Sequence, residues 1–292
     1  MSTSENVLNL IQTKFLDFSK SHKKIANFIL EHYDEAPYIT AAKLGQSVGV
    51  SESTVVRFAT EIGYSGYPEM QKAISDAMRS QLTAAQRVSV TSGRVDSDNV
   101  LEHVLASDMH NIRKSLEQID KADFEKIVEA IVRAKNIYIL GVRSSASLAS
   151  FLSFYLNLIS PNVHNVLAST TSELFEEILR INDGDVFIGI SFPRYSKRTL
   201  KAINYAKSRS ATVISITDSP SSPLASAADL CLTACSDMVS FVDSLVAPLS
   251  VINALLVSIS MKKQHEIVET LEQLEQIWDE YEVYEKFETE GK

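Results

Sequence analysis

A short run of hydroxyl side chains leads to an arginine one helical turn further along the chain. The run contains Ser51, Glu52, Ser53, Thr54 and Arg57. Hydroxyls bond to phosphate oxygens or base edges, while an arginine in this position can pair bidentately with guanine or hold a phosphate. The residue types and spacing predict contact with DNA, with Arg57 as the leading specificity residue.

The surrounding residues predict two crossing helices that would present this run. In the segment ITAAKLGQSVGVSESTVVRFATEI, residues 39–62, Gly45 stands where the helices approach too closely for a large side chain. Gly49 can adopt the positive φ of a tight turn. Ser51 would then cap the second helix, whose first turns would enter the major groove. Apolar residues repeat at the inward-facing positions of both helices: Leu44, Val48, Val50, Val55 and Phe58.

Further DNA contacts are predicted on either side of this helix pair. Thr40 can cap the first helix and direct its amides at a phosphate. Tyr64, together with Ser65 and Tyr67, follows Gly63 and could reach the DNA backbone. In the alternative interpretation the hydroxyls are only helix caps and the arginine is a solvated charge, so that its replacement by alanine would leave DNA affinity unchanged.

Two more groups of hydroxyl and cationic side chains follow apolar runs later in the chain. Each group leads into a predicted helix, and helix amides combined with hydroxyls suit an anion. For either group alone, helix-capping serines and solvated arginines are the plainer interpretation. Because the combination occurs twice, we favour a shared anionic ligand. The residues concerned are Arg143, Ser144 and Ser145 after the first run, and Ser191, Arg194, Ser196 and Thr199 after the third.

Helical segments alternate with short apolar runs from about Leu101 onward, which predicts a parallel sheet wrapped by helices. Ligands of such sheets bind at the carboxyl ends of the strands, where both polar groups stand. We predict an all-helical domain over residues 1–78, a polar connecting segment over 79–106 and the α/β domain over 107–292. The predicted strands cover residues 137–140, 163–166, 186–190, 213–216 and 230–232.

Charge does not favour non-specific binding to a polyanion. The 292 residues, 45% of them apolar, can bury a large core. Residues 1–80 carry 8 Lys and Arg against 9 Asp and Glu, and the remainder carries 20 against 28. Because neither part is basic, the sequence indicates a specific, dimeric DNA site, or an interaction module that has lost DNA binding.

Cysteine usage and hydropathy indicate a cytoplasmic protein. Cys231 and Cys235, four residues apart on a predicted strand, would lie about 13 Å apart, too far for a disulfide. We expect no metal site there and a reducing compartment. The chain begins without a charged-then-apolar leader, and polar residues interrupt the apolar run Leu245–Met261, which predicts a buried helix. Residues 266–290 predict an acidic terminal helix, so no membrane contact is expected.

Several separated motifs together resemble the RpiR (MurR/RpiR) transcriptional regulators across nearly the whole chain. The resemblance implies an N-terminal helix-turn-helix and a C-terminal sugar isomerase (SIS) domain with a flavodoxin-like, three-layer fold around a five-stranded parallel sheet. It rests on SHKKIA at 21–26, VSESTVVRF at 50–58, GYSGY at 63–67, the two polar strand-end loops, ITD at 216–218, and SPLA at 222–225 followed by Ala228-Asp229.

By this resemblance, the protein is expected to repress or activate sugar-catabolism genes as a homodimer or tetramer that senses a phosphosugar. The effector's phosphate would be held by Ser144, Ser145, Ser191, Ser196 and Thr199. The chain departs from the family pattern Ser-x-Ser-Gly-x-Thr, since Pro193 and Arg194 replace the Ser-Gly pair, and Arg143 stands at a position often held by glycine. The added positive charges favour an acidic sugar or another anion as effector.

SIS domains also occur in aldose-ketose isomerases, which need a positioned base. The candidate bases Glu173, His164 and Asp243 are scattered along the sequence without a readable spacing. We therefore predict no catalytic residue, no cofactor and no metal. A sugar-phosphate isomerase, or a sensor that does not bind DNA, is the alternative.

Overall fold

The computed structural model describes residues 7–32, 36–81, 99–237 and 242–285. They form two compact units, one within Met1–Asn99 and the other within Val100–Val239 and Asp243–Lys292. Each unit has its own hydrophobic core.

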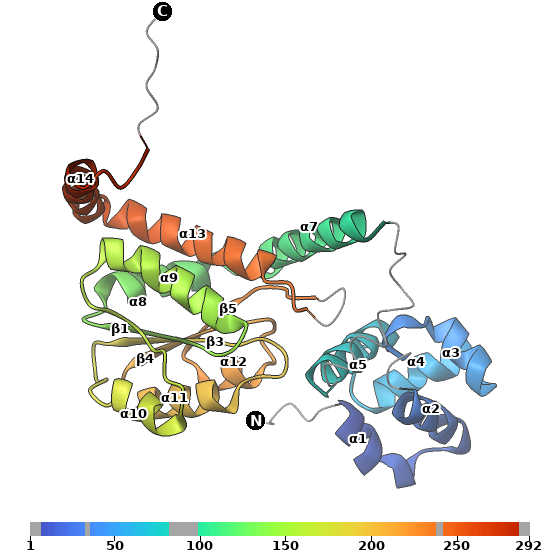
Figure 1. The fold of residues 1–292 in the computed structure, drawn as a ribbon. Coiled ribbons are helices and arrows are strands. Elements are labelled where there is room, and N and C mark those ends of the chain that lie inside the picture. The colour runs from blue at the N-terminus through green and yellow to red at the C-terminus, as the bar shows by residue number, and fades with distance from the viewer. Residues whose placement is uncertain (1–6, 33–35, 82–98, 238–241, 286–292) are drawn as a thin grey trace, which may run out of the picture. The chain divides into compact units, whose positions relative to one another are not determined.

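The described part of the first unit is helical, as predicted, and its helices share one buried core (Figure 1). Ile25, Leu44, Phe58 and Met70 from four different helices are fully buried in it. Its elements are α1 (Val7–Thr13), the 3-10 turns η1 (Phe15–Asp17) and η2 (Ala36–Tyr38), α2 (Lys20–Glu31), α3 (Ala41–Val48), α4 (Glu52–Glu61) and α5 (Tyr67–Gln81).

The second unit contains a five-stranded, fully parallel sheet in the order β2-β1-β3-β4-β5. Strands β1 and β3 are buried along their whole length, which explains why both are continuous apolar runs. The prediction of a five-stranded parallel sheet is confirmed. The strands are β1 (Ile137–Gly141), β2 (Val163–Asn165), β3 (Val186–Ile190), β4 (Thr212–Thr217) and β5 (Leu230–Thr233).

Helices cover both faces of this sheet and complete a three-layer arrangement (Figure 1). The helices α8 (Lys121–Arg133), α9 (Ser145–Ile159) and α13 (Val246–Lys262) pack on one face. The opposite face carries α10 (Thr171–Glu177), α11 (Lys197–Ser208) and α12 (Pro223–Ala227). The predicted buried helix at residues 245–261 is therefore confirmed as α13.

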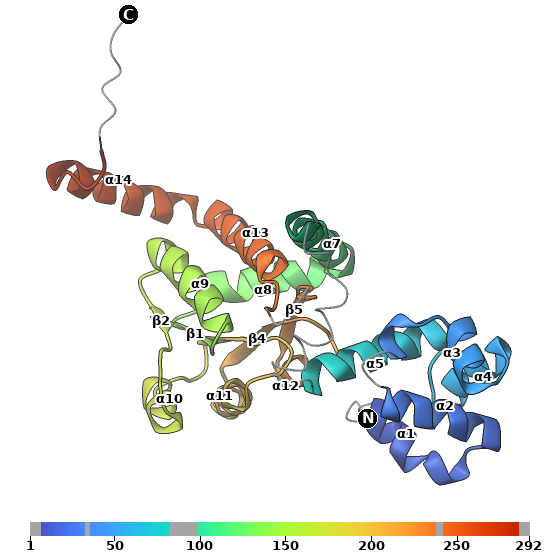
Figure 2. The same ribbon diagram turned by 45° about the vertical axis from the view of Figure 1, so that its right-hand side comes forward.

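Two more helices extend the second unit, α7 (Val100–Gln118) and α14 (Gln264–Glu280), and Figure 2 shows both beside α13. Helix α5 continues to Gln81 and α7 begins at Val100, so both enter the range 79–106 that the sequence suggested as a connecting segment. Cys231 and Cys235 are free thiols.

Within the described residues, no single helix combines the length and apolar composition needed to cross a membrane. Among the described helices, α13 and α14 taken together meet that test of length and composition, and they are bent by 98° at their junction.

Candidate DNA-binding and effector sites

The turn between α3 and α4 has the geometry that its two glycines predict. The Thr40 hydroxyl caps α3 by accepting a hydrogen bond from the Lys43 amide at 3.2 Å. Gly49 ends the helix with φ 69° and ψ 44°, in the left-handed region. A Cβ atom on Gly45 would lie 2.7 Å from the Val50 carbonyl oxygen, so this position needs glycine for the close approach of the helices.

The first turns of α4 gather the predicted DNA-contacting side chains on one exposed end. The Ser51 hydroxyl caps the helix by accepting from the Thr54 amide at 3.3 Å, and it lies 2.9 Å from the Ser53 hydroxyl and 2.8 Å from that of Thr54. Arg57 is exposed, and its Nε donates to the Ser53 carbonyl at 3.4 Å. Glu52 is exposed beside them. Hydroxyl groups and a guanidinium are therefore presented together.

The three residues after α4 that were predicted to contact DNA differ in their burial and hydrogen bonding. Tyr67 is buried, and its hydroxyl donates to the Ile39 carbonyl at 2.8 Å, so the suggestion that it touches DNA was wrong. The amide and hydroxyl of Ser65 both donate to the Glu69 carboxylate, which lowers the pKa of Glu69. Tyr64 remains half-buried at the surface, and the pKa of its phenol is raised, first by burial and then by the nearby Glu69 charge.

The two strand-end loops meet at the point where the sheet's strand order reverses. The chain goes from β1 to β2 on one side and then returns to β3 on the other side of β1. Gly141 at the end of β1 pairs with Ile190 at the end of β3. In open parallel sheets, the crevice at such a switch point is the usual place for a ligand.

The first loop, after β1, combines a close backbone approach with a strained arginine. A Cβ atom on Gly141 would collide with the carbonyl group of Ser145, which is itself buried. Ser144 stands at the N-cap of α9, where its side chain makes no capping hydrogen bond within the described structure. Arg143 is exposed and has φ 60°, in the left-handed region.

The second loop, after β3, contains a chain of hydroxyl groups. The Ser191 hydroxyl accepts from the Ser196 amide at 3.0 Å, and the Ser196 hydroxyl caps α11 by accepting from the Thr199 amide at 3.2 Å. These serines act as caps, yet each hydroxyl hydrogen can still be donated. Thr199 is fully buried, and among the described residues its hydroxyl has no hydrogen-bond partner. Arg194 is exposed with φ 69°.

The structure adds two residues to this region that sequence reasoning did not single out. Arg198 donates to the Ala168 carbonyl at 3.4 Å and to the Ser169 carbonyl at 2.6 Å, and so ties α11 to the loop after β2. The Tyr195 hydroxyl donates to Asp218 at 2.9 Å. Both stand within the run of polar residues after β3, which was the available signal in the sequence.

The candidate bases for an isomerase lie in separate elements. The Glu173 carboxylate accepts from the amides of Ser169 at 2.8 Å and Thr170 at 3.1 Å, in a capping box at the start of α10. His164 in β2 stacks on Tyr138 with ring centroids 4.7 Å apart. Among the described residues, no three His, Cys, Asp or Glu side chains are grouped so that they could hold a metal ion.

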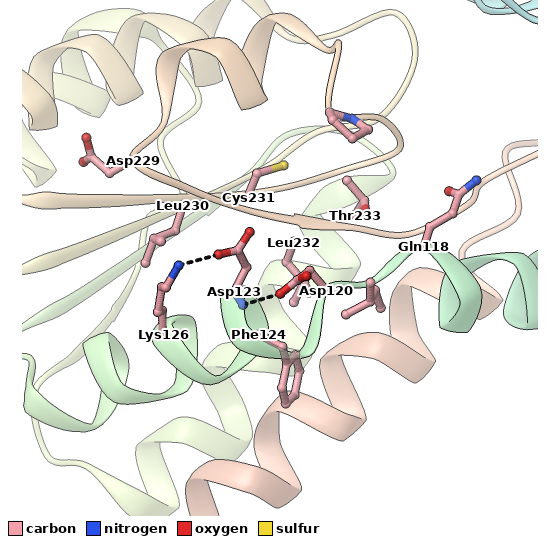
Figure 3. A pocket seen from close by; sticks show the side chains of 12 residues that line it. Gln118, Asp120, Asp123, Phe124, Lys126, Asp229, Leu230, Cys231, Leu232 and Thr233 are labelled. Carbon is pink, nitrogen blue, oxygen red and sulfur yellow. Dashed lines mark hydrogen bonds and ion pairs between the residues drawn. The ribbon is translucent and has the colours of Figure 1, made fainter. Parts of the chain in front are cut away.

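A cavity of about 420 Å³ opens between the start of α8 and the edge strand β5 (Figure 3). Its lining residues do not include those of the two strand-end loops. The carboxylates that line it already have structural partners: Asp120 caps α8, Asp123 pairs with Lys126 at 2.7 Å, and Asp229 pairs with Lys207 at 3.0 Å. We therefore keep the strand-end loops as the candidate effector site.

Comparison with known protein families assigns a domain type to each of the two units. A model for the helix-turn-helix domain of the rpiR family matches residues 5–81, and a model for the SIS domain matches residues 130–258. The chain belongs to the RpiR family. It is thus a transcriptional regulator with a helix-turn-helix and a SIS domain.

Relatives of this RpiR-family regulator match it over most of their length. An HTH-type transcriptional regulator of Caldanaerobacter subterraneus subsp. tengcongensis is 28% identical, with 91% of this chain and 94% of that protein covered. The HTH-type transcriptional regulator HexR of Pseudomonas aeruginosa is 25% identical, with 78% of each chain covered.

Two solved structures share the fold of this chain. The sugar isomerase domain of an RpiR transcription factor from Sphaerobacter thermophilus is 28% identical with a TM-score of 0.59, and covers 61% of this chain and 99% of its own. The Vibrio vulnificus NanR protein complexed with ManNAc-6P is 22% identical with a TM-score of 0.59, and covers 94% of this chain and 99% of its own.

Proposed function

We propose that this regulator binds a specific double-stranded operator through α3 and α4, and that an anionic, sugar-derived effector at the strand-end loops changes that binding. It acts as a cytoplasmic homo-oligomer on genes of carbohydrate metabolism. The observation that carries the proposal is the exposed end of α4, where Arg57 and the hydroxyls of Ser51, Ser53 and Thr54 lie together.

The packing of α4 supports its role as the recognition helix. Val55, Phe58 and Ala59 are fully buried, which fixes the helix against the rest of the unit. The opposite side is free to enter a major groove, as in other helix-turn-helix proteins. Phosphate contacts from the hydroxyls would set the register, and Arg57 would read a base edge, most favourably guanine. Thr40, Glu52 and Tyr64 would make the flanking contacts.

The arginines of the strand-end loops support an anionic effector. A left-handed conformation costs a non-glycine residue about 1–2 kcal/mol, and both Arg143 and Arg194 adopt it. Strain of this kind is typical of functional sites. A guanidinium binds carboxylate or phosphate bidentately, and the phosphosugar bound by NanR is consistent with such a ligand. We therefore favour a sugar that carries a carboxylate and a phosphate.

The hydroxyls around these arginines would hold the phosphate. Ser144 is exposed at the N-cap of α9, and Ser145 begins that helix. Ser191 directly follows β3, while Ser196 and Thr199 lie at the start of α11. The Thr199 hydroxyl has no hydrogen-bond partner among the described residues, and a buried polar group usually has a protein, water or ligand partner. The SIS domain acts here as a sensor and not as an enzyme. This is supported by Glu173, whose carboxylate is engaged in capping.

The first test is a fluorescence-anisotropy titration against DNA upstream of the protein's own gene and a scrambled duplex, at near-physiological salt. We expect preferential binding to the upstream DNA, weakened by Arg57→Ala. Lys72→Ala, which removes an exposed charge outside α4, is the matched control and should keep the preference. Equal binding to the two duplexes would reject the DNA-reading function.

A thermal-shift screen tests the effector class separately. Sugar acids that carry a phosphate should raise the melting temperature more than neutral sugar phosphates of the same length. Stabilisation by neutral sugar phosphates but not by acidic ligands would argue against the role of the two arginines.

A further inference from the structure

Helix α7 packs on its own unit through polar side chains. Asn111 and Ser115 are buried, and the side-chain amide of Asn111 donates to the backbone carbonyl of Asp237 at 3.0 Å. The Ser115 hydroxyl accepts from the Cys235 amide at 2.8 Å. Lys114 pairs with the Asp237 carboxylate at 3.0 Å, and Asp108 accepts from Ser244 at 2.6 Å. The inner face of α7 is therefore held by hydrogen bonds and an ion pair.

The apolar stripe of the same helix points to solvent. Its members follow one another at four, four, three and four residues, which places them on one face of a helix. The exposed fractions are 72% for Leu101, 53% for Leu105, 65% for Met109, 39% for Ile112 and 75% for Leu116. An amphipathic helix normally buries such a stripe, and exposed apolar patches of this kind mark interaction sites.

We infer that this stripe packs against the same stripe of a second copy of the chain, with the two α7 helices antiparallel about a two-fold axis near Asp108 and Met109. The inference rests on the proposed homo-oligomeric function and names its interface. The stripe suits this symmetry because its outer members balance around that point: Leu101 would face Leu116 of the partner subunit, and Leu105 would face Ile112 of the partner subunit. A two-fold interface requires such self-complementarity.

Charge selects the antiparallel arrangement over the parallel one. Glu102 and Arg113 are both exposed and border the stripe on the same side, near its opposite ends. In an antiparallel pair, Glu102 approaches Arg113 of the partner subunit, and the contact occurs twice. A parallel two-fold pair would place the two Glu102 side chains at opposite edges of the interface, each facing the other side of the partner's stripe, so the contact between Glu102 and Arg113 would not form.

The antiparallel arrangement places the N-terminal ends of the two α7 helices far apart. Helix α7 has 19 residues and so is about 28 Å long. Antiparallel pairing places its two first residues at opposite ends of the pair. That separation is of the same order as the roughly 34 Å between half-sites one DNA turn apart.

Cysteine cross-linking tests the symmetry directly. With a short bismaleimide, Met109→Cys should form a covalent dimer, since this position lies near the axis. Leu101→Cys should not link to itself, but should link when mixed with Leu116→Cys. The wild-type chain is the background control, because Cys235 is buried and burial raises the pKa of the Cys231 thiol. Leu179→Cys, at a residue 61% exposed elsewhere on the unit, should not link.

Sedimentation of charge variants tests the energetics. Leu105→Glu should raise the dimer dissociation constant by about 100-fold or more, while Leu179→Glu leaves it unchanged. Self-linking of Leu101→Cys would indicate a parallel pair and overturn the inference. So would failure of Met109→Cys to link, or an unchanged assembly in Leu105→Glu, since either result means that something else covers the stripe. Neither measurement includes DNA, so these outcomes leave the proposed DNA binding to its own test.

Discussion

The turn of the helix-turn-helix and the strand-end loops of the SIS domain use the same backbone conformation with different residues. In the first unit, Gly49 has φ 69°. In the second, Arg143 has φ 60° and Arg194 has φ 69°. Glycine adopts this region freely, whereas a residue with a Cβ atom does so at a cost.

This difference separates a structural use of the conformation from a functional one. The helix turn needs only the change of direction, so the residue without a side chain suffices, and the proposed DNA contacts are assigned to neighbouring residues. The strand-end loops retain a guanidinium although glycine would fit the backbone better. We interpret that retention as the binding role of the side chain.

The largest loss of stability is expected at Gly45, where the first unit has no room for a side chain. Gly45→Val would push its Cβ atom against the Val50 carbonyl, 2.7 Å away, and the backbone there cannot easily move. We expect a loss of about 3 kcal/mol in the stability of this unit, measured by hydrogen exchange of residues 36–62. Gly66→Ala is the control, because its added Cβ would meet Pro68 at an ordinary 3.7 Å. Equal protection in the two variants would refute the close approach.

Arg57→Ala should weaken operator binding without weakening the fold. The guanidinium is exposed, and in the described structure it donates to the Ser53 carbonyl of its own helix, so the melting temperature should not change. Loss of a bidentate base contact costs about 1–3 kcal/mol, or roughly 5- to 150-fold in affinity. A uniform loss over all duplexes, with a smaller salt dependence, would instead assign Arg57 to a phosphate.

Gly49→Ala isolates the conformational cost in the turn. No described atom outside the glycine and its chain neighbours lies within 4 Å of the added Cβ, so the strain at positive φ is the main effect. We expect a loss of about 1 kcal/mol, readable as a lower denaturant midpoint. Unchanged stability would show that the turn relaxes to another conformation.

Arg194→Gly and Arg143→Gly should stabilise the second unit, in contrast to the loss of stability expected for Gly49→Ala in the first. Each should raise the stability of the ligand-free protein by about 0.5–1 kcal/mol, since strain is removed. Each should also reduce stabilisation by an acidic effector. The alanine variants at these positions provide the matched comparison, because they remove the charge and keep the strain. If glycine and alanine variants are equally stable, the arginines are not strained.

The smallest effect concerns the Ser65–Glu69 contact beside the helix turn. Hydrogen bonds from the Ser65 hydroxyl and amide lower the pKa of Glu69 from its ordinary value of 4.5 in the folded state. The contribution to stability is therefore complete above that value and is lost as the pH falls through the lowered pKa. Ser65→Ala should flatten this part of the stability profile, and a profile identical to wild type would show that the contact contributes nothing.

Much of the first unit could be predicted because its determinants are local. Gly45, Gly49 and Ser51 each fix the backbone within a few residues of themselves, and the apolar period identified both helices. Tyr67 was misjudged because its hydroxyl bonds to the Ile39 carbonyl, 28 residues away. Local spacing does not reveal such a partner.

In the second unit, too, features that depend on partners distant in the sequence could not be predicted. Continuous apolar runs identified β1, β3 and β4, because strands buried on both faces need no polar side. The predicted run at β2 contains His164 and Asn165, and that strand is only partly buried. The left-handed conformation of Arg143 and Arg194 depends on the backbone and could not be read from residue types. Helix α7 begins within the range suggested as a connector, and its polar inner face depends on Asp237, 126 residues from Asn111.

The central claim is that an anion at the strand-end loops changes operator affinity. The most direct measurement is an anisotropy titration of upstream DNA with and without a saturating sugar acid phosphate, in wild type and in the Arg143→Gly, Arg194→Gly double variant. We predict a change of roughly 5- to 150-fold in wild type, corresponding to a coupling of about 1–3 kcal/mol, and none in the double variant. Operator affinity that stays constant with every acidic and neutral sugar phosphate, while the protein still prefers its own upstream DNA, would contradict the account.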